Sequence, residues 1–407
     1  MARRDIRAAV DIGSGTVRAV IAESRPGGVS LVGAGHCASA GLRKGVVIDI
    51  EAAGAAVANA VAMAESESGT AVSSVLVGVS GSHLCSAPSL GRTTVATSDR
   101  EIAQEDVDRA LESCRQAGAA PDREIVQIVP REFAIDGQAG IQRPVGMSGV
   151  ILEVDAQVIS GSSTALQNVR RAVSRANLEI DGMVLQSVAC AEAVLSQEEA
   201  ESGAIVLDIG LATTDIAVYR DGGLLHASLV PIGGGHITND IALVLKVPVA
   251  YAEDLKLRYG AATADDVSPD DKCGGEAGVS RQILCQIIEA RLDQLFDRVK
   301  RDLAEAGVDG QYAGGVVIVG GTAGLAGITD VVTKAFDMPA RIGHALRVAG
   351  DEGITGAPAY AAALGLAVQA CGDGTGQSGA RGGRRRRGRK NSLTNSVIDW
   401  FREVFNS

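Results

Sequence analysis

Two short stretches of similar sequence decide the fold of this chain. They read Val10-Asp11-Ile12-Gly13-Ser14-Gly15-Thr16 and Leu207-Asp208-Ile209-Gly210-Leu211-Ala212-Thr213. Each stretch starts in an apolar run and is followed by another, which is the pattern of two strands joined by a tight turn. A repeated strand–turn–strand unit predicts two related halves that face each other across a cleft. A chance match between two glycine-containing turns is the alternative.

Turns of the type Asp-x-Gly suit the binding of phosphate. Their successive backbone N–H groups form a nest for anionic oxygens, and glycine lets a ligand approach the backbone closely. The candidate nucleotide-binding residues are Asp11, Gly13, Ser14, Gly15 and Thr16 in the first turn, and Asp208, Gly210, Thr213 and Thr214 at the second. Asp11 and Asp208 would hold Mg²⁺ through water, because Mg²⁺ keeps most of its hydration. One such turn alone is more simply a hairpin with an Asx turn; two equivalent turns favour phosphate binding.

A third glycine-rich stretch covers residues 314–325, where the apolar run Val316–Val319 leads into Gly320, Gly321 and Thr322. Ligands of open α/β sheets bind at the carboxyl ends of the strands, so these three residues join the candidate site. An ordinary strand-to-helix turn explains this stretch equally well when it is taken alone.

The rest of the chain predicts an α/β protein of more than one domain. Short apolar runs alternate with longer helical patterns, of which residues 50–67 and 281–304 are the clearest. The formal net charge of −11 argues against nucleic acid as a partner. The seven cysteines contain no C-x-x-C spacing, which disfavours a metal or redox motif. No apolar run is long enough to cross a bilayer.

The three glycine-containing stretches together resemble the two phosphate segments and the adenosine segment of the actin-like ATPase superfamily. Within that superfamily, residues 124–153 and 232–242 are similar to the FtsA family, with Val129-Pro130-Arg131-Glu132-Phe133 and Pro144-Val145-Gly146-Met147-Ser148-Gly149 inside an inserted subdomain. The resemblance runs from about residue 5 to residue 370. It implies an actin-like (ribonuclease-H-like) ATPase fold with two α/β halves around a nucleotide cleft.

The resemblance also implies domain limits. Subdomain 1A would cover residues 5–84 and 165–199, and the inserted subdomain 1C residues 85–164. Subdomain 2A would cover 200–231 and 310–370, and subdomain 2B residues 232–309. A flexible basic linker over 371–391 and an amphipathic helix over 392–407 would follow.

Further site residues come from the same resemblance. Gly234 and Gly235 follow the second phosphate segment, while Glu253 and Lys256 match an acidic and a basic residue that flank the adenosine. A solvated helix face is the alternative for this pair. Gln186 aligns with the residue that positions water in related ATPases. Leu211 and Ala212 stand where many relatives have glycine, which puts the phosphate geometry in question, and any ATPase activity is expected to be weak at most.

The C-terminal segment predicts attachment to a membrane surface. Residues 381–390 contain six Arg and one Lys, which would attract anionic lipid. Beyond them an amphipathic helix is too short to span a bilayer but can lie in its surface. The apolar side chains of that helix are Leu393, Val397, Trp400, Phe401, Val404 and Phe405, with Ile398 on the same arc. Docking of this helix on the core of the protein is the alternative.

The resemblance implies a role in cell division. The partners would be the C-terminal peptide of the tubulin-like protein FtsZ, other copies of the chain in filaments, anionic inner-membrane lipid, and other divisome proteins bound by the inserted subdomain. ATP with Mg²⁺ would be the cofactor. Arg291 and Arg298, two turns apart on one helix, are candidates for the peptide carboxylates, unless both are simply solvated. The expected location is the cytoplasmic face of the cell membrane at the division septum. An actin-fold small-molecule kinase, a chaperone-like ATPase and a pilus-assembly relative are the alternatives.

Overall fold

The computed structural model describes residues 5–26, 28–97, 99–118, 120–265, 267–274 and 278–372. The predicted membrane helix and nearly all of the predicted linker lie outside these residues. The first two linker positions, Cys371 and Gly372, form the end of helix α11 (Ala361–Gly372). No helix among the described residues is long and apolar enough to cross a membrane.

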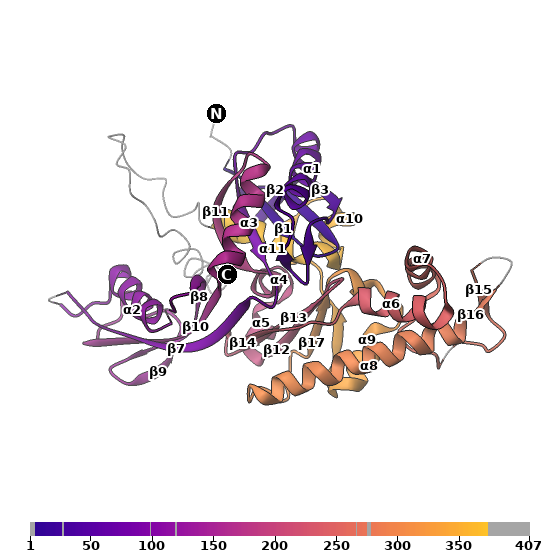
Figure 1. Cartoon of the computed structure of the whole chain (residues 1–407). Coiled ribbons are helices and arrows are strands. Elements are labelled where there is room, and N and C mark those ends of the chain that lie inside the picture. Colours follow the sequence, from indigo (N-terminus) through magenta and orange to yellow (C-terminus); the bar gives the residue numbers. More distant parts are fainter. Residues whose placement is uncertain are drawn as a thin grey trace.

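The first half of the molecule is a six-stranded sheet with the order β11-β6-β1-β2-β3-β19. Its strands are β1 (Ile6–Ile12), β2 (Thr16–Arg25), β3 (Gly28–Ala38), β6 (Ser74–Val79), β11 (Glu179–Leu185) and β19 (Val348–Ala349). Because strand side chains alternate, Ala8 and Val10 pack in the same core as α1 (Ile50–Ser68) and α3 (Ser163–Arg175), whereas Ala9 packs with α11 on the other face. Helices therefore cover both faces of this sheet (Figure 1).

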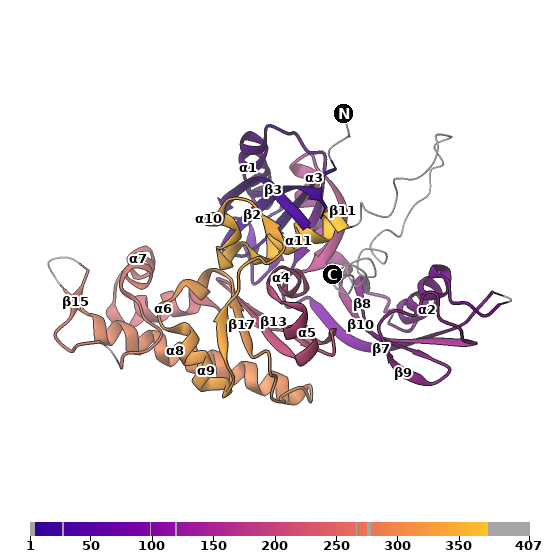
Figure 2. The same cartoon turned by 180° about the vertical axis from the view of Figure 1, so that it is seen from behind.

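The second half is a five-stranded sheet with the order β14-β13-β12-β17-β18. Its strands are β12 (Ala204–Ile209), β13 (Thr214–Arg220), β14 (Gly223–Val230), β17 (Val316–Val319) and β18 (Ala340–Ile342). Helix α4 (Gln186–Val194) contacts β12 and β13 of this sheet and also α11, and all its residues are buried. A Cβ at Gly365 of α11 would lie only 1.7 Å from the carbonyl oxygen of Ala189, so glycine is what allows the two helices to pack this closely. Figure 2 shows α4 and α11 between the two sheets.

Three helices form the end of the molecule next to the second sheet. They are α6 (Gly234–Leu245), α7 (Val249–Tyr259) and α8 (Arg281–Glu305), and the short strands β15 (Lys272–Cys273) and β16 (Val279–Ser280) accompany them. The Ser280 hydroxyl caps α8 by accepting from the N–H of Ile283. The predicted helices over 50–67 and 281–304 are confirmed. The apolar stripe of α8 is buried and consists of Leu284, Ile288, Leu292, Leu295, Val299 and Leu303.

A separate small domain extends from the opposite end of the molecule (Figures 1 and 2). It is a four-stranded antiparallel sheet in the order β7-β10-β8-β9, formed by β7 (Leu84–Thr94), β8 (Arg123–Ile135), β9 (Gln138–Ile141) and β10 (Ile151–Ser162), with α2 (Gln104–Ala117) packed on it. The chain enters and leaves this domain at adjacent positions, since the N–H of Ser162 donates to the carbonyl of His83 at 3.2 Å.

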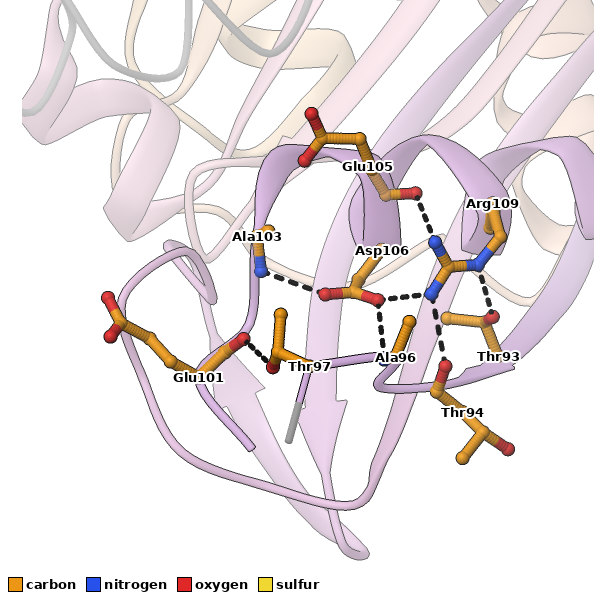
Figure 3. A network of polar contacts seen from close by, with 9 residues as sticks. All are labelled: Thr93, Thr94, Ala96, Thr97, Glu101, Ala103, Glu105, Asp106 and Arg109. Atoms are coloured by element: carbon orange, nitrogen blue, oxygen red, sulfur yellow. Dashed lines mark hydrogen bonds and ion pairs between the residues drawn. The ribbon is translucent and has the colours of Figure 1, made fainter. Parts of the chain in front are cut away.

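One buried carboxylate organises the start of α2. Asp106 accepts the backbone N–H of Ala103 at 2.8 Å and of Ala96 at 3.1 Å, and it also pairs with Arg109 (Figure 3). Arg109 in turn donates to the carbonyl of Thr94 at 3.1 Å. The network fastens the first turn of α2 to the end of β7, which fixes how the helix lies on its sheet.

The remaining short elements connect these parts. They are β4 (Leu42–Arg43), β5 (Val46–Val47), α5 (Gln197–Ser202), η1 (Gly321–Gly324), α9 (Ile328–Phe336), α10 (Glu352–Thr355) and η2 (Pro358–Tyr360). Among them, η1 and η2 lie next to one another and close the end of β17.

The repeat seen in the sequence is present in the strand register. Asp11 pairs with Arg18 across the β1–β2 hairpin, and Asp208 pairs with Asp215 across the β12–β13 hairpin. Each first strand also has a parallel neighbour, β6 beside β1 and β17 beside β12. The two glycine turns therefore stand at equivalent positions of two similarly built halves, as the repeat predicts.

Candidate nucleotide-binding cleft

A cavity of about 780 Å³ lies between the two halves, where both Asp-x-Gly turns meet. Sixteen predicted site residues line it: Asp11, Gly13, Ser14, Gly15, Thr16, Gln186, Asp208, Gly210, Thr213, Gly234, Gly235, Glu253, Lys256, Gly320, Gly321 and Thr322. Thr214 does not line the cavity, so its predicted role as a hydroxyl donor to phosphate is corrected. It is fully buried and its hydroxyl donates to the carbonyl of Ile232 at 2.8 Å, because neighbouring strand residues point to opposite faces.

The first turn places Asp11 at the floor of the cavity. The side-chain amide of Gln186, at the start of α4, donates to Oδ1 of Asp11, and Nη1 of Arg18 lies 4.0 Å from Oδ2. The Ser14 hydroxyl accepts the N–H of Gly45 at 3.1 Å, which ties the turn to the loop between β4 and β5. Gln186 therefore contacts the first carboxylate directly.

The second turn places Asp208 against the end of β17. Gly320 has φ +88°, and a Cβ there would lie 2.4 Å from Oδ1 of Asp208, so only glycine fits beside this carboxylate. The Cys190 thiol donates to Oδ2 of Asp208 at 3.5 Å. The third glycine-rich stretch thus meets the second turn, as the strand-end rule predicts.

Burial is the main influence on the carboxylates of the cleft, and it outweighs the positive charge of Arg18. Burial raises the pKa of Asp11 to about 7, although Arg18 opposes the shift and Asp208 adds to it. Burial also raises the pKa of Asp208, and together with the charge of Asp208 it raises the pKa of Asp215 to about 8. A bound cation would stabilise all three carboxylates in their charged form.

Oxygen ligands of this kind suit Mg²⁺. In the described part of the chain, no three Asp, Glu, His or Cys side chains come close enough to enclose a metal ion. Asp11 and Asp208 are the two predicted metal carboxylates that line the cavity.

Leu211 brings the two turns together. A Cβ at Gly15 would lie 3.0 Å from Cβ of Leu211, and one at Gly235 would lie 3.2 Å from Cδ1 of the same side chain. Leu211 is nevertheless 44% exposed. Leu211 thus stands between the first turn and α6.

Helices α6 and α7 form the other wall of the cavity. The amides of Gly234 and Gly235 donate to the carbonyls of Gly210 and Leu211 at 2.8 and 2.7 Å, so α6 is fixed to the second turn. Nζ of Lys256 donates to Glu253 at 2.7 Å and to the hydroxyl of Thr238 at 2.9 Å. Glu253 and Lys256 face the cavity as a pair and also join α7 to α6.

The two arginines predicted to bind a peptide lie away from the cleft on α8. Arg291 is paired with Asp240 of α6, with Nη2 2.8 Å from Oδ1. Arg298 is exposed two turns further along the helix. Arg291 thus has a partner within the chain, whereas Arg298 is open to solvent.

The cleft is also lined by polar residues that the sequence motifs do not predict, among them Arg18, Ser80 and Asp215. The hairpin register could have revealed two of them, because Arg18 and Asp215 are the direct partners of Asp11 and Asp208. No motif in the sequence marks Ser80, which reaches the cleft only because β6 pairs with β1.

Solved structures with the same fold cover nearly the whole chain. The PilM–PilN type IV pilus biogenesis complex aligns with a TM-score of 0.66 at 18% identity, covering 90% of this chain and 98% of that one. MreB 5 of Spiroplasma citri bound to AMPPNP aligns with a TM-score of 0.50 at 14% identity, covering 90% and 95%. Two related α/β halves around a cleft with paired Asp-x-Gly turns define an actin-like ATPase fold.

The sequence relatives narrow this class to one family. The family model described as cell division protein FtsA matches residues 205–365, and the SHS2 domain inserted in FtsA matches residues 81–160. The chain belongs to the FtsA family of cell-division proteins. It is 35% identical to cell division protein FtsA of Pseudomonas aeruginosa over 367 residues, 88% of this chain and 87% of the relative.

Further relatives agree with this assignment. Cell division protein FtsA of Neisseria meningitidis is 36% identical over 371 residues, which are 89% of each chain, and that of Escherichia coli K12 is 32% identical over 378 residues, 89% of this chain and 90% of the relative. The protein is an actin-like cell-division protein, and this membership favours division over a small-molecule kinase.

Proposed function

We propose that this protein binds ATP with Mg²⁺ in the cleft and tethers FtsZ filaments to the cytoplasmic face of the cell membrane at the division septum. The proposal of nucleotide binding rests on one observation. Asp11 and Asp208, from two equivalent turns, line a single cavity that Gly320 also lines. A cavity of about 780 Å³ is of the size that accepts a nucleotide.

Each part of the nucleotide has candidate partners. The backbone amides and hydroxyls of residues 13–16 and of Thr213 would hold the phosphates, and Asp11 and Asp208 would hold Mg²⁺ through water. The ion would neutralise phosphate charge. Gly320, Gly321 and Thr322 with Glu253 and Lys256 would receive the adenosine. Gln186, which orients Asp11, is the candidate for positioning water, so any hydrolysis would depend on it.

The tethering role combines the family with the C-terminal sequence. The predicted amphipathic helix over 392–407 and the Arg-rich segment before it would bind anionic inner-membrane lipid. The helical region of α6–α8 would bind the C-terminal peptide of FtsZ. Other divisome proteins would bind the inserted domain, and copies of the chain would assemble into filaments. We do not expect nucleic acid to be a partner.

The substitution Asp208→Ala tests the nucleotide site. It removes a carboxylate that would organise the metal and should weaken binding of a fluorescent ATP analogue in the presence of Mg²⁺ by about tenfold or more. Asp181→Ala is the matched control, because Asp181 is exposed on β11 and bonds only to Ser74. Equal affinity of the Asp208→Ala variant and the parent would show that the cleft is assigned wrongly.

A further inference from the structure

A hydrogen bond crosses the cleft beside the candidate phosphate site. The Ser80 hydroxyl, just after β6 in the first half, donates to Oδ1 of Asp215 on β13 of the second half at 2.6 Å. Both side chains are buried, at 7% and 4% exposure. Thr213 of the second turn also donates to Asp215, at 3.4 Å. Asp215 thus joins the second turn to the opposite half of the molecule.

Ser80 is joined in a similar way to the first turn. A Cβ at Gly45 would lie 2.6 Å from the carbonyl oxygen of Ser80, so these two backbones are in close contact. The N–H of Gly45 donates to the hydroxyl of Ser14. A continuous series of contacts therefore runs from Ser14 through Gly45, Ser80 and Asp215 to Thr213, linking both turns without any ligand.

The small domain that contains β7 to β10, called the inserted domain here, is attached at both ends of the Ser80–Asp215 bond, which we call the bridge. Ser80 leads within four residues into β7, its first strand. On the other side, Nε2 of Gln157 on β10 donates to the carbonyl of Leu225 at 2.8 Å, and β14, which carries Leu225, pairs directly with β13. Gln157 is itself buried and accepts from the Ser86 hydroxyl at 2.8 Å. A change in the separation of the halves would therefore act on the inserted domain from two sides.

We propose that Ser80 and Asp215 are a positioning pair, whose hydrogen bond holds the two phosphate turns at the separation that a nucleotide requires and couples that separation to the inserted domain through Gln157. The proposal rests on the proposed binding of nucleotide in the cleft. A nucleotide that touches both turns binds only when the halves are closed. Because the apparent Kd rises as the closed fraction of the free protein falls, loss of the bond should weaken binding.

The bridge itself is tested first in the full-length protein without nucleotide, by hydrogen exchange. Ser80→Ala should speed exchange of the amides at residues 43–47 and 213–216 and along β7 and β10. Asp215→Ala should do the same, whereas Asp215→Asn keeps an acceptor and should resemble the parent. Ser228→Ala is the matched control, since it removes a hydroxyl–carboxylate bond to Asp302 within one half. Unchanged exchange in the Ser80→Ala protein would overturn the proposal.

Nucleotide binding is measured next, with a fluorescent ATP analogue and Mg²⁺. Ser80→Ala should raise the Kd several-fold, up to about tenfold, because an intramolecular hydrogen bond contributes up to about 1.4 kcal/mol. In the Ser80→Ala, Asp215→Ala double variant, the Kd should rise by less than the product of the two single effects, because both changes remove the same bond. Single effects that multiply would overturn the pairing. Failure of the parent to bind the analogue would instead refute the proposed function, and the exchange data would still decide on the bridge.

Discussion

The side-chain amide of Gln186 donates a hydrogen bond to Oδ1 of Asp11, and both residues are buried at the floor of the cleft. Gln186 begins α4, the helix between the two sheets, so this bond fixes a carboxylate of the first half to the central helix. The sequence suggested only that Gln186 positions water. Its observed contact adds a role in orienting Asp11.

Removal of this amide should affect both binding and turnover. In Gln186→Ala, Asp11 loses its donor, and we expect the Kd for an ATP analogue with Mg²⁺ to rise about five- to tenfold. Any ATP hydrolysis should fall further. Gln197→Ala is the control, because Gln197 makes an exposed amide–carboxylate bond to Glu201 on the surface helix α5. Parent-like affinity in Gln186→Ala would mean that the bond to Asp11 does not organise the site.

The buried carboxylate of the inserted domain should be important for its stability. Asp106→Asn keeps the shape of the side chain but loses charge-assisted bonds from two backbone amides and Arg109. We expect the local opening free energy of α2 to fall by about 1.5–3 kcal/mol, measured by hydrogen exchange because several domains unfold in this chain. Asp108→Asn on the same helix, where Asp108 bonds only to Gln104, should change little. Equal protection of α2 in both variants would contradict this role.

The same carboxylate predicts a pH dependence. Burial works against ionisation, but the backbone bonds from Ala103 and Ala96 and the charge of Arg109 outweigh it and lower the pKa of Asp106 below 3.8. A lowered folded-state pKa gives a stabilisation that is complete above about pH 4 and is lost as the pH falls through the folded value. The difference in α2 protection between the parent and Asp106→Asn should therefore shrink below about pH 4. A difference that stays constant down to pH 2 would show that the charge of Asp106 is not responsible.

The peptide site proposed on α8 can be tested by charge reversal. Arg291→Glu with Arg298→Glu should weaken binding of the FtsZ C-terminal peptide by about tenfold or more, since each exposed ion pair contributes up to about 1 kcal/mol and reversal adds repulsion. The single variants separate the contributions of the two residues to peptide binding, because only Arg291 is paired with Asp240. Arg301→Glu on the same helix is the control. Unchanged peptide affinity in the double variant would remove both residues from the site.

Membrane binding should depend on two signals. Each of Trp400 and Phe401 would contribute roughly 1.5–3 kcal/mol on burial, so Trp400→Glu with Phe401→Glu should lower partitioning onto liposomes about a hundredfold or more. ATP binding should remain intact. Co-sedimentation of the full chain with liposomes measures this loss, and full binding by the variant would exclude the apolar arc as the anchor.

The arginine segment supplies the second signal. Charge reversal of Arg384, Arg385, Arg386 and Arg387 should weaken binding to anionic liposomes alone, and high salt should have the same effect on the parent. Neutral liposomes are the control. If the variant kept full affinity for anionic liposomes at low salt, the apolar face alone would be the anchor.

The sequence predicts the two turns well because their chemistry is local. An Asp, a glycine and the apolar residues around them specify strand, turn and strand, and the two copies occupy equivalent places in the structure. Ser80 could not be found in this way, since its place in the cleft follows from the pairing of β6 with β1. Thr214 was assigned wrongly because the sequence does not show where the turn ends and the alternation of strand side chains begins. Hydrogen-bond partners such as Gln157 and Leu225 come from different domains and share no local pattern.

The adjacent entry and exit of the inserted domain have a consequence for how such proteins can change. With the N–H of Ser162 bonded to the carbonyl of His83, the two ends of the inserted domain lie next to each other. A unit bounded in this way can be removed, exchanged or acquired as a cassette, because replacing it by a short turn costs little loop-closure entropy. Related proteins can therefore differ in this domain while they keep the two halves of the molecule, and chimeras joined at His83 and Ser162 offer a direct way to exchange the domain in the laboratory.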